Sequence, residues 1–166
     1  MNKLEIIASK ILDREQLRRA LIVWNFKNKK IVFTNGCFDI LHLGHIEYLA
    51  RAAQLGDVLV IGLNTDRSVR EIKGMHRPIN DEKSRAMVLA ALHFVTAVVL
   101  FDEKTPAELI REIQPDILVK GKDYVPEKVV GHDIVKAKGG KVVTIELTPG
   151  YSTTGIEEKI LRLKNL

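Results

Sequence analysis

Five short apolar segments alternate along this chain with stretches whose apolar residues follow helical spacing. The segments are rich in Val, Ile and Leu and comprise residues 31–34, 58–63, 97–101, 117–120 and 142–147. Such runs, without strict alternation of polar and apolar residues, are typical of strands that are covered on both faces, as in a parallel sheet. Because parallel neighbours need a crossover, usually a helix, we expect right-handed strand–helix–strand units. The pattern predicts an α/β fold, a doubly wound five-stranded parallel sheet with helices on both faces.

The helical stretches begin at recognisable capping residues. Asp13 with Gln16 forms a capping-box pattern ahead of the first strand. Residues 105–108 offer a second box, with proline at the first helical position. Asn80 is predicted to cap the helix that carries Arg85. These starts place one helix before the sheet and one after each strand.

The composition is that of an ordinary globular protein, with 46% hydrophobic and 28% charged residues in a chain of 166. We expect one domain over residues 1–166, with residues 1–28 as a leading helical segment. Cys37 is the only cysteine, so an internal disulfide is excluded. The sequence has no secretory signal pattern and no apolar run of about 20 residues. These features predict a soluble, cytoplasmic protein without a membrane contact.

The net charge of +5 comes from Lys and Arg residues that are scattered along the chain, and aromatic residues make up only 5%. Nucleic-acid binders more often cluster basic residues beside exposed aromatics. We therefore expect no nucleic-acid partner. Small anionic ligands, such as nucleotides and sugar phosphates, suit a mild positive charge better.

The most informative segment is residues 35–45, Asn-Gly-Cys-Phe-Asp-Ile-Leu-His-Leu-Gly-His, which joins the first strand to a helix. His42 and His45 should lie at the helix N-terminus, where free backbone N–H groups and the helix dipole favour a phosphate. Gly44 has no Cβ and lets a ligand approach the backbone closely. Two imidazoles at such a place can donate hydrogen bonds to phosphate oxygens as negative charge builds in a transition state.

Other interpretations of this segment have less support. Two histidines at this spacing would suit half a zinc site, but His76, His93 and His132 are dispersed and show no ligand spacing. We therefore predict no protein metal ligands. The sequence also lacks the GxxxxGK[ST] pattern of P-loop proteins and a GxGxxG pattern after the first strand.

Residues 35–45 resemble the HxGH signature of the cytidylyltransferase-like nucleotidyltransferases, whose fold is Rossmann-like. Residues 150–154, Gly-Tyr-Ser-Thr-Thr, resemble the second signature of that superfamily. Further segments are similar to the adenylyltransferases that form ADP-heptose from D-glycero-β-D-manno-heptose 1-phosphate. They are the turn at residues 64–66, Lys73-Gly74, Arg77-Pro78, the helix opening at Arg85, residues 115–124 and the signature turns themselves. The resemblance extends from about residue 29 to the end of the chain.

The resemblance implies that the nucleotide is bound by the two signature turns. The implied residues are Gly36, Cys37, Phe38, Asp39, His42, Gly44, His45, Ser152, Thr153 and Thr154. His42, His45 and Lys73 are predicted to be catalytic, with the two imidazoles stabilising the transition state at the α-phosphate. Cys37 is expected to contribute its backbone N–H and not a nucleophilic thiol.

A second group is expected to bind the acceptor. It comprises Asn64, Asp66, Lys73, Arg77, Arg85, Lys120 and Asp123. Lys73 and Arg77 would clamp phosphates in a loop whose closure excludes water. No general base is needed, since a sugar phosphate with a second pKa near ~6 is already anionic at neutral pH. Mg²⁺ is expected with the ATP substrate, held mainly by phosphate oxygens.

The resemblance therefore implies transfer of AMP from ATP to heptose 1-phosphate, by direct in-line attack, with ADP-heptose and pyrophosphate as products. A related enzyme such as glycerol-3-phosphate cytidylyltransferase stays an alternative, because backbone groups read most of the base. A nucleotide-binding module without catalysis and a sheet-edge interaction domain are further alternatives. Relatives often form homodimers. In some the domain is fused to a sugar kinase, which we expect here as a separate upstream enzyme.

Overall fold

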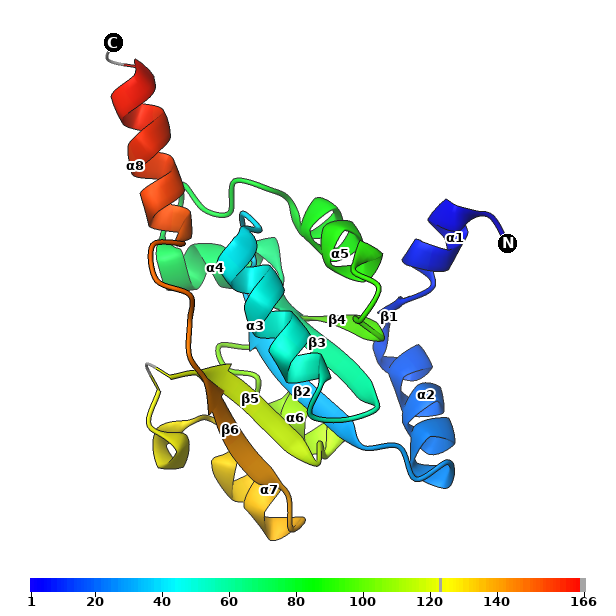
Figure 1. Ribbon diagram of the computed structural model, residues 1–166. Helices are drawn as coiled ribbons and strands as arrows, with labels where there is room; N and C mark the ends of the chain where they lie inside the picture. Colours follow the sequence, from blue (N-terminus) through cyan, green and yellow to red (C-terminus); the bar gives the residue numbers. More distant parts are fainter. Residues whose placement is uncertain (123, 165–166) are drawn as a thin grey trace.

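Six parallel strands form one sheet in the computed structural model, which describes residues 1–122 and 124–164 (Figure 1). The strands are β1 (Ile11–Leu12), β2 (Ile31–Gly36), β3 (Val58–Asn64), β4 (Ala97–Phe101), β5 (Ile117–Gly121) and β6 (Lys141–Ile145). Their order across the sheet is β1-β4-β3-β2-β5-β6, and every neighbouring pair is parallel. The predicted α/β fold with a parallel sheet is confirmed.

The predicted number of five strands is one too few. β1 pairs with β4 at the edge of the sheet and lies within the segment that was predicted to be helical. A strand of two residues is too short to stand out in a hydrophobic pattern. The last strand also ends two residues earlier than predicted, at Ile145, and Leu147 is half exposed.

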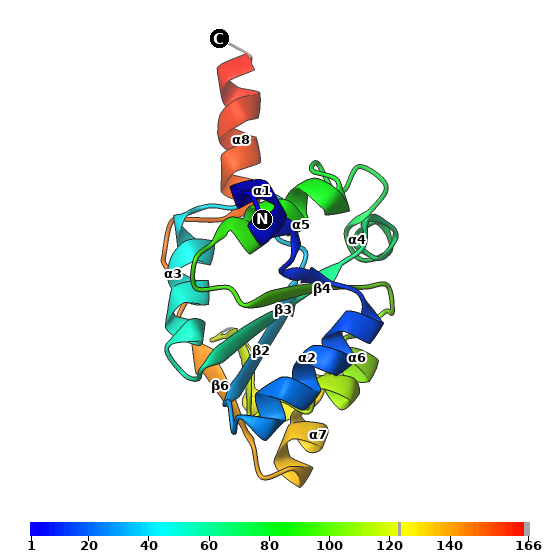
Figure 2. The ribbon, with the colours of Figure 1, turned by 90° about the vertical axis from the view of Figure 1, so that its right-hand side faces the viewer.

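Helices cover both faces of the sheet (Figure 2). They are α1 (Lys3–Ala8), α2 (Arg14–Phe26), α3 (Leu43–Ala53), α4 (Asp66–Lys73), α5 (Glu82–Ala91), α6 (Ala107–Ile113), α7 (His132–Ala137) and α8 (Thr153–Lys164), with a short 3-10 helix η1 (Pro126–Lys128). α3 and α5 pack on one face, where Leu49 and Leu89 join a buried cluster with strand residues. α2, α6 and α7 pack on the other, around Leu17, Phe33 and Ile110. This two-sided burial explains why the strands read as continuous apolar runs.

The capping predictions have mixed outcomes. The box before α2 is confirmed, since Asp13 and Gln16 each accept the other's backbone N–H through their side chains. The cap of α5 is Asp81 and not Asn80. The box at residues 105–108 is not formed, because α6 begins one residue late, with Pro106 at the N-cap and no side-chain cap.

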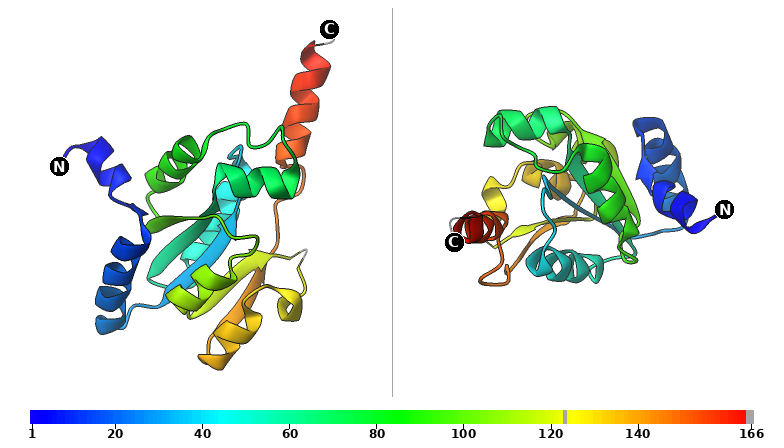
Figure 3. Two further views of the ribbon diagram at one scale, coloured as in Figure 1. Left: turned by 180° about the vertical axis from the view of Figure 1, so that it is seen from behind. Right: turned by 90° about the horizontal axis from the view of Figure 1, so that it is seen from above.

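The strand order reverses between β2 and β5, since β3 and β4 lie on one side of β2 and β5 and β6 on the other. Ligands of doubly wound sheets bind beyond the carboxyl ends of the strands at such a switch point. α8 leaves this end of the sheet and projects away from the rest of the molecule (Figures 1 and 3). None of its described residues is buried. Within the described part of the chain, no helix has both the length and the apolar character needed to cross a membrane.

Candidate active site

Two stacked histidines lie where β2 gives way to α3. His42 is the N-cap of α3, and its ring lies 3.9 Å from that of His45, measured between centroids, with 28° between the ring planes. The Nδ1 atoms of both rings are buried and have no hydrogen-bond partner among the described residues. A buried polar atom without a partner costs about 1–3 kcal/mol. The pair therefore has the character of a preformed binding site for a polar ligand.

Burial sets the charge of the two rings. It lowers the pKa of His42. Burial, together with the charges of His42 and Lys73, lowers the pKa of His45 to about 4. Both imidazoles are therefore neutral at pH 7 in the free protein, although a hydrogen bond between the His45 ring and the Ile40 backbone opposes the shift. A neutral imidazole has one N–H donor and one acceptor nitrogen. Lys73, the predicted catalytic lysine, is close enough for its charge to lower the pKa of His45.

The turn between β2 and α3 is held in an unusual conformation. Phe38 has φ of 45°, in the left-handed region, which costs a residue other than glycine about 1–3 kcal/mol. Its buried ring packs edge-on against His45, with 5.4 Å between centroids. A Cβ on Gly36 would lie 3.1 Å from this ring. Gly36 and Phe38 thus shape the turn that the sequence predicts to bind the nucleotide.

The second signature turn lies against the first. A Cβ on Gly44 would approach both the His42 ring and Cβ of Tyr151 to 3.2 Å, so a glycine is needed for this close packing. Ser152 Oγ accepts the N–H of Gly155 at 3.0 Å, as an N-cap does. The two threonines that follow open α8. The structure therefore brings together the residues that the sequence predicts to hold the nucleotide.

Asp39 joins the first turn to the loop between α4 and α5. Its buried carboxylate accepts the N–H groups of Ile79 at 2.8 Å and Asn80 at 3.0 Å, and Arg77 Nη1 at 2.7 Å. Burial alone would raise the pKa of Asp39, but these hydrogen bonds outweigh it and the pKa is lowered. The charged carboxylate anchors the loop between α4 and α5.

Arg77 connects the same loop to α8. While Nη1 pairs with Asp39, Nη2 pairs with Glu157, and the side chain is 18% exposed. Two carboxylates thus hold the guanidinium close to both signature turns. A phosphate bound to Arg77 would share this guanidinium with the carboxylates or compete with them.

Arg85 is placed differently from its predicted role at the substrate. Its side chain is 1% exposed, and its guanidinium donates to Cys37 O, Asn80 O and Asp66 Oδ1. Each of the three nitrogens already has a protein acceptor. In this conformation, direct contact between Arg85 and a substrate is not favoured.

Asn64 and Cys37 meet beside the turn. Cys37 Sγ lies 3.9 Å from Asn64 Oδ1, while Asn64 Nδ2 donates to Ser68 Oγ at 2.8 Å. Burial raises the pKa of the Cys37 thiol against the opposing charges of Lys73 and Arg85. The thiol is therefore protonated at neutral pH, which disfavours a nucleophilic thiolate.

Lys120 spans the switch point from the end of β5. Its Nζ donates to Asn35 Oδ1 at 2.5 Å and lies 5.7 Å from the centre of the Tyr124 ring. Asp123, the other predicted residue of this loop, lies outside the described residues. Lys120 therefore reaches the carboxyl end of β2, directly before the first signature turn.

Sequence reasoning did not select three residues that this geometry brings into the site, Asn35, Asn80 and Glu157. Asn35 lies near the carboxyl end of β2 and is the first residue of the signature segment 35–45, and that position was an available signal. Asn80 was assigned to a helix cap, whereas its N–H and side-chain amide bind Asp39. Nothing in the sequence pattern distinguishes Glu157 from the other charged residues of α8.

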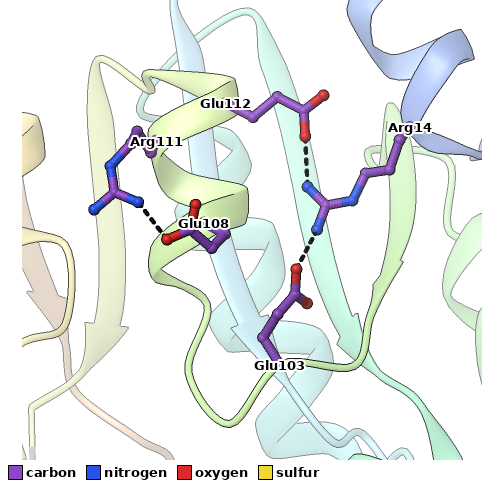
Figure 4. Close-up of a pocket in the computed structure, with 5 residues that line it drawn as sticks. All are labelled: Arg14, Glu103, Glu108, Arg111 and Glu112. Atoms are coloured by element: carbon purple, nitrogen blue, oxygen red, sulfur yellow. Dashed lines mark hydrogen bonds and ion pairs between the residues drawn. The ribbon is translucent and has the colours of Figure 1, made fainter.

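A surface hollow of about 450 Å³ lies elsewhere, between α2, α6 and the loop after β4. Figure 4 shows Arg14 between Glu103 and Glu112, with Arg111 paired to Glu108. Its two arginines are both paired with glutamates, and it contains none of the predicted site residues. The described residues also include no group of three or more His, Cys, Asp or Glu side chains suited to a metal ion. The predicted site residues lie at the signature turns and the segments around them, away from this hollow.

Comparisons with known proteins identify relatives over most of the chain. The chain is 56% identical over 153 residues to the bifunctional protein HldE of Syntrophotalea carbinolica, which covers 92% of this chain and 31% of the relative. It thus spans about a third of the length of the curated relatives that it matches.

Two solved structures have a fold similar to that of this chain. A lipopolysaccharide core biosynthesis protein from Thermoplasma volcanium has a TM-score of 0.58 and 32% identity, covering 72% of this chain and 97% of that one. A pantoate-beta-alanine ligase from Francisella tularensis shares the fold at TM-score 0.56 and 18% identity, over 94% and 79% of the two chains. Residues 33–159 match the family model described as cytidylyltransferase-like. Since the match includes both signature turns and the sheet between them, the chain belongs to the cytidylyltransferase-like family.

Proposed function

We propose that this protein transfers AMP from ATP to D-glycero-β-D-manno-heptose 1-phosphate and releases ADP-heptose and pyrophosphate. The observation that carries the proposal is the pair of neutral, stacked histidines with unpartnered Nδ1 atoms at the N-terminus of α3. Family membership supports nucleotidyl transfer. The relative named HldE and the similar lipopolysaccharide core biosynthesis protein favour the sugar acceptor that the sequence segments suggest.

In the proposed reaction, an oxygen of the sugar phosphate attacks the α-phosphorus of ATP. A bond forms between them as the bond to the bridging oxygen breaks, and that oxygen leaves with pyrophosphate. His42 and His45 donate hydrogen bonds to phosphate oxygens as the charge grows. Lys73 and Arg77 neutralise the phosphates and orient the acceptor. The attacking oxygen is already anionic, so no protein base is required.

The residues divide between the two substrates. The proposed nucleotide contacts come from the turns, namely Gly36, Cys37, Phe38, Asp39, His42, Gly44, His45, Ser152, Thr153 and Thr154. The proposed acceptor contacts are Asn64, Asp66, Lys73, Arg77, Lys120 and Asp123. Arg85 is not in this group, because its guanidinium already donates to three protein acceptors.

We also propose a Mg²⁺ cofactor, a homodimeric assembly and a cytoplasmic location. Mg²⁺ would be held mainly by oxygens of the triphosphate, which need no dedicated carboxylate cluster. Residues 1–166 would act as the nucleotidyltransferase domain, and a sugar kinase activity would supply the acceptor. The cytoplasm is the proposed location, because ATP and sugar phosphates are made there. The exposed Ile160, Leu161 and Leu163 of α8 support a homodimer, which light scattering would test.

A substrate panel tests the reaction. The protein is mixed with Mg²⁺, ATP or CTP, and heptose 1-phosphate, other sugar 1-phosphates or glycerol 3-phosphate, while pyrophosphate release is followed. We expect release with ATP and heptose 1-phosphate. Release only with CTP and glycerol 3-phosphate would assign the cytidylyltransferase alternative. ATP binding without release from any pair would indicate a binding module and would contradict the proposal.

A further inference from the structure

Arg85 connects three segments that converge on the signature turn. We infer that Arg85 is a positioning residue, which fixes the backbone of the β2–α3 turn for phosphate binding without itself contacting a substrate. This inference rests on the proposed function for its catalytic readout. Its structural basis is independent of which acceptor is used.

The contacts of the buried guanidinium run in three directions. Nη1 donates to Cys37 O at 2.6 Å, in the turn after β2. Nε donates to Asn80 O at 3.0 Å, in the loop before α5. Nη2 donates to Asp66 Oδ1 at 2.8 Å, in the first turn of α4. Glu82, on the same helix as Arg85, accepts the N–H of Asp66 at 2.8 Å and braces that segment a second time.

The contact with Cys37 O controls the direction of a backbone donor. A trans peptide is planar, with its C=O and N–H on opposite sides. Fixing the carbonyl of Cys37 therefore fixes the direction of the Phe38 N–H. Phe38 holds a left-handed φ of 45°, a conformation that persists only where the surroundings enforce it. Without Arg85, this peptide would be free to rotate and release the strained turn.

Arginine is needed for the shape of its donors as much as for its charge. A planar guanidinium presents several N–H groups in a rigid fork, whereas a lysine has one nitrogen on a flexible stem. One ammonium cannot reach three acceptors that lie in different directions. A lysine at position 85 would therefore keep the charge and lose the connection between the segments.

The test compares Arg85→Lys and Arg85→Met with Arg18→Lys, a change at a 60% exposed arginine of α2. We expect both substitutions at Arg85 to lower kcat about 10²-fold, the effect of a small misplacement of reacting groups, with little change in either KM. The Arg18 control should match the unmodified protein. Near-normal activity in Arg85→Lys would overturn the inference. A raised KM for the sugar phosphate with normal kcat would indicate direct substrate contact and would also overturn it.

Hydrogen exchange followed by mass spectrometry supplies a readout that needs no activity. In Arg85→Lys we expect faster exchange in residues 36–41, 64–68 and 77–81, with β4 and α6 unchanged. Unchanged exchange in the three segments, or loss of protection throughout the protein, would contradict a positioning role. An unmodified protein without activity would refute the proposed function, whereas the exchange result would still decide the inference.

Discussion

The two signature turns differ in how the protein holds them. The HxGH turn is anchored from several sides, through Asp39 to the loop before α5 and through Arg85 to three segments. The Ser-Thr-Thr turn opens a helix without a buried residue, and Tyr151 beside it is 47% exposed. It approaches the first turn where Tyr151 lies against Gly44, and it is linked to that turn by the path from Glu157 through Arg77 to Asp39. The HxGH turn is therefore preorganised, whereas the Ser-Thr-Thr turn is attached to the rest of the site by few contacts.

This difference suits the proposed chemistry. Donors that face developing charge are most effective when they need no rearrangement during the reaction, which favours a rigid first turn. A segment that closes over a substrate must be able to move. An isolated helix of about 12 residues is marginal in water, so the position of α8 depends on the contacts of its first turns. Phosphate binding to Arg77 would therefore be coupled to the placement of α8.

Substitution of the two carboxylates that pair with Arg77, Asp39 and Glu157, tests most directly whether the two turns are held differently. We expect Asp39→Asn to lower the free energy of unfolding by about 3 kcal/mol, because it leaves a largely buried guanidinium short of its partner. Glu157→Gln should cost about 1 kcal/mol or less, since that pair is nearer the surface. Urea denaturation of both variants measures the difference. Equal losses would mean that the two turns are held equally firmly.

The dependence of stability on pH tests the burial of His45 in the HxGH turn. Because the pKa of His45 is lowered to about 4 in the folded protein, the unfolded chain binds more protons between its ordinary value of 6.5 and about 4. With respect to His45, the free energy of unfolding is therefore highest above pH 6.5 and declines as the pH falls toward 4. We expect a loss of about 2 kcal/mol between pH 7 and pH 5, measured by urea denaturation. His45→Gln should remove most of this slope. An unchanged slope in that variant would contradict the burial of the imidazole.

The contact between the turns is probed by Gly44→Ala. The added Cβ would lie 3.2 Å from both the His42 ring and Tyr151, so one of them must move. Crowding of this kind costs about 1–3 kcal/mol. We expect a loss of unfolding free energy near the lower end, since Tyr151 is half exposed and can yield, and a rise of about tenfold in the KM for ATP because the second turn is displaced. A steady-state assay at varied ATP measures it, and a fall in kcat at constant KM would show that His42 moves instead.

The sequence predicted those parts of the molecule whose signals are local. Apolar runs indicated five of the strands, while β1 was too short to show a pattern. Both signature turns were found because residues close in the chain act together there. The contacts of Asp39 with Asn80 and of Arg77 with Glu157 join segments 41 and 80 residues apart. The spacing of residues also does not reveal that Arg85 is buried. Arg85 was predicted to bind the substrate, whereas in the structure its guanidinium donates to Cys37 O, Asn80 O and Asp66 Oδ1.

The most direct test of the account measures pyrophosphate release from ATP and heptose 1-phosphate by His42→Ala and His45→Ala, with His93→Ala, an exposed histidine, as the control. ATP binding is measured in parallel by calorimetry. The account predicts a fall of about 10²–10³ in kcat for the first two variants, with ATP still bound and the control unaffected. Variants of His42 and His45 that keep normal kcat, or lose only ATP affinity, would contradict a role of these histidines in the transition state.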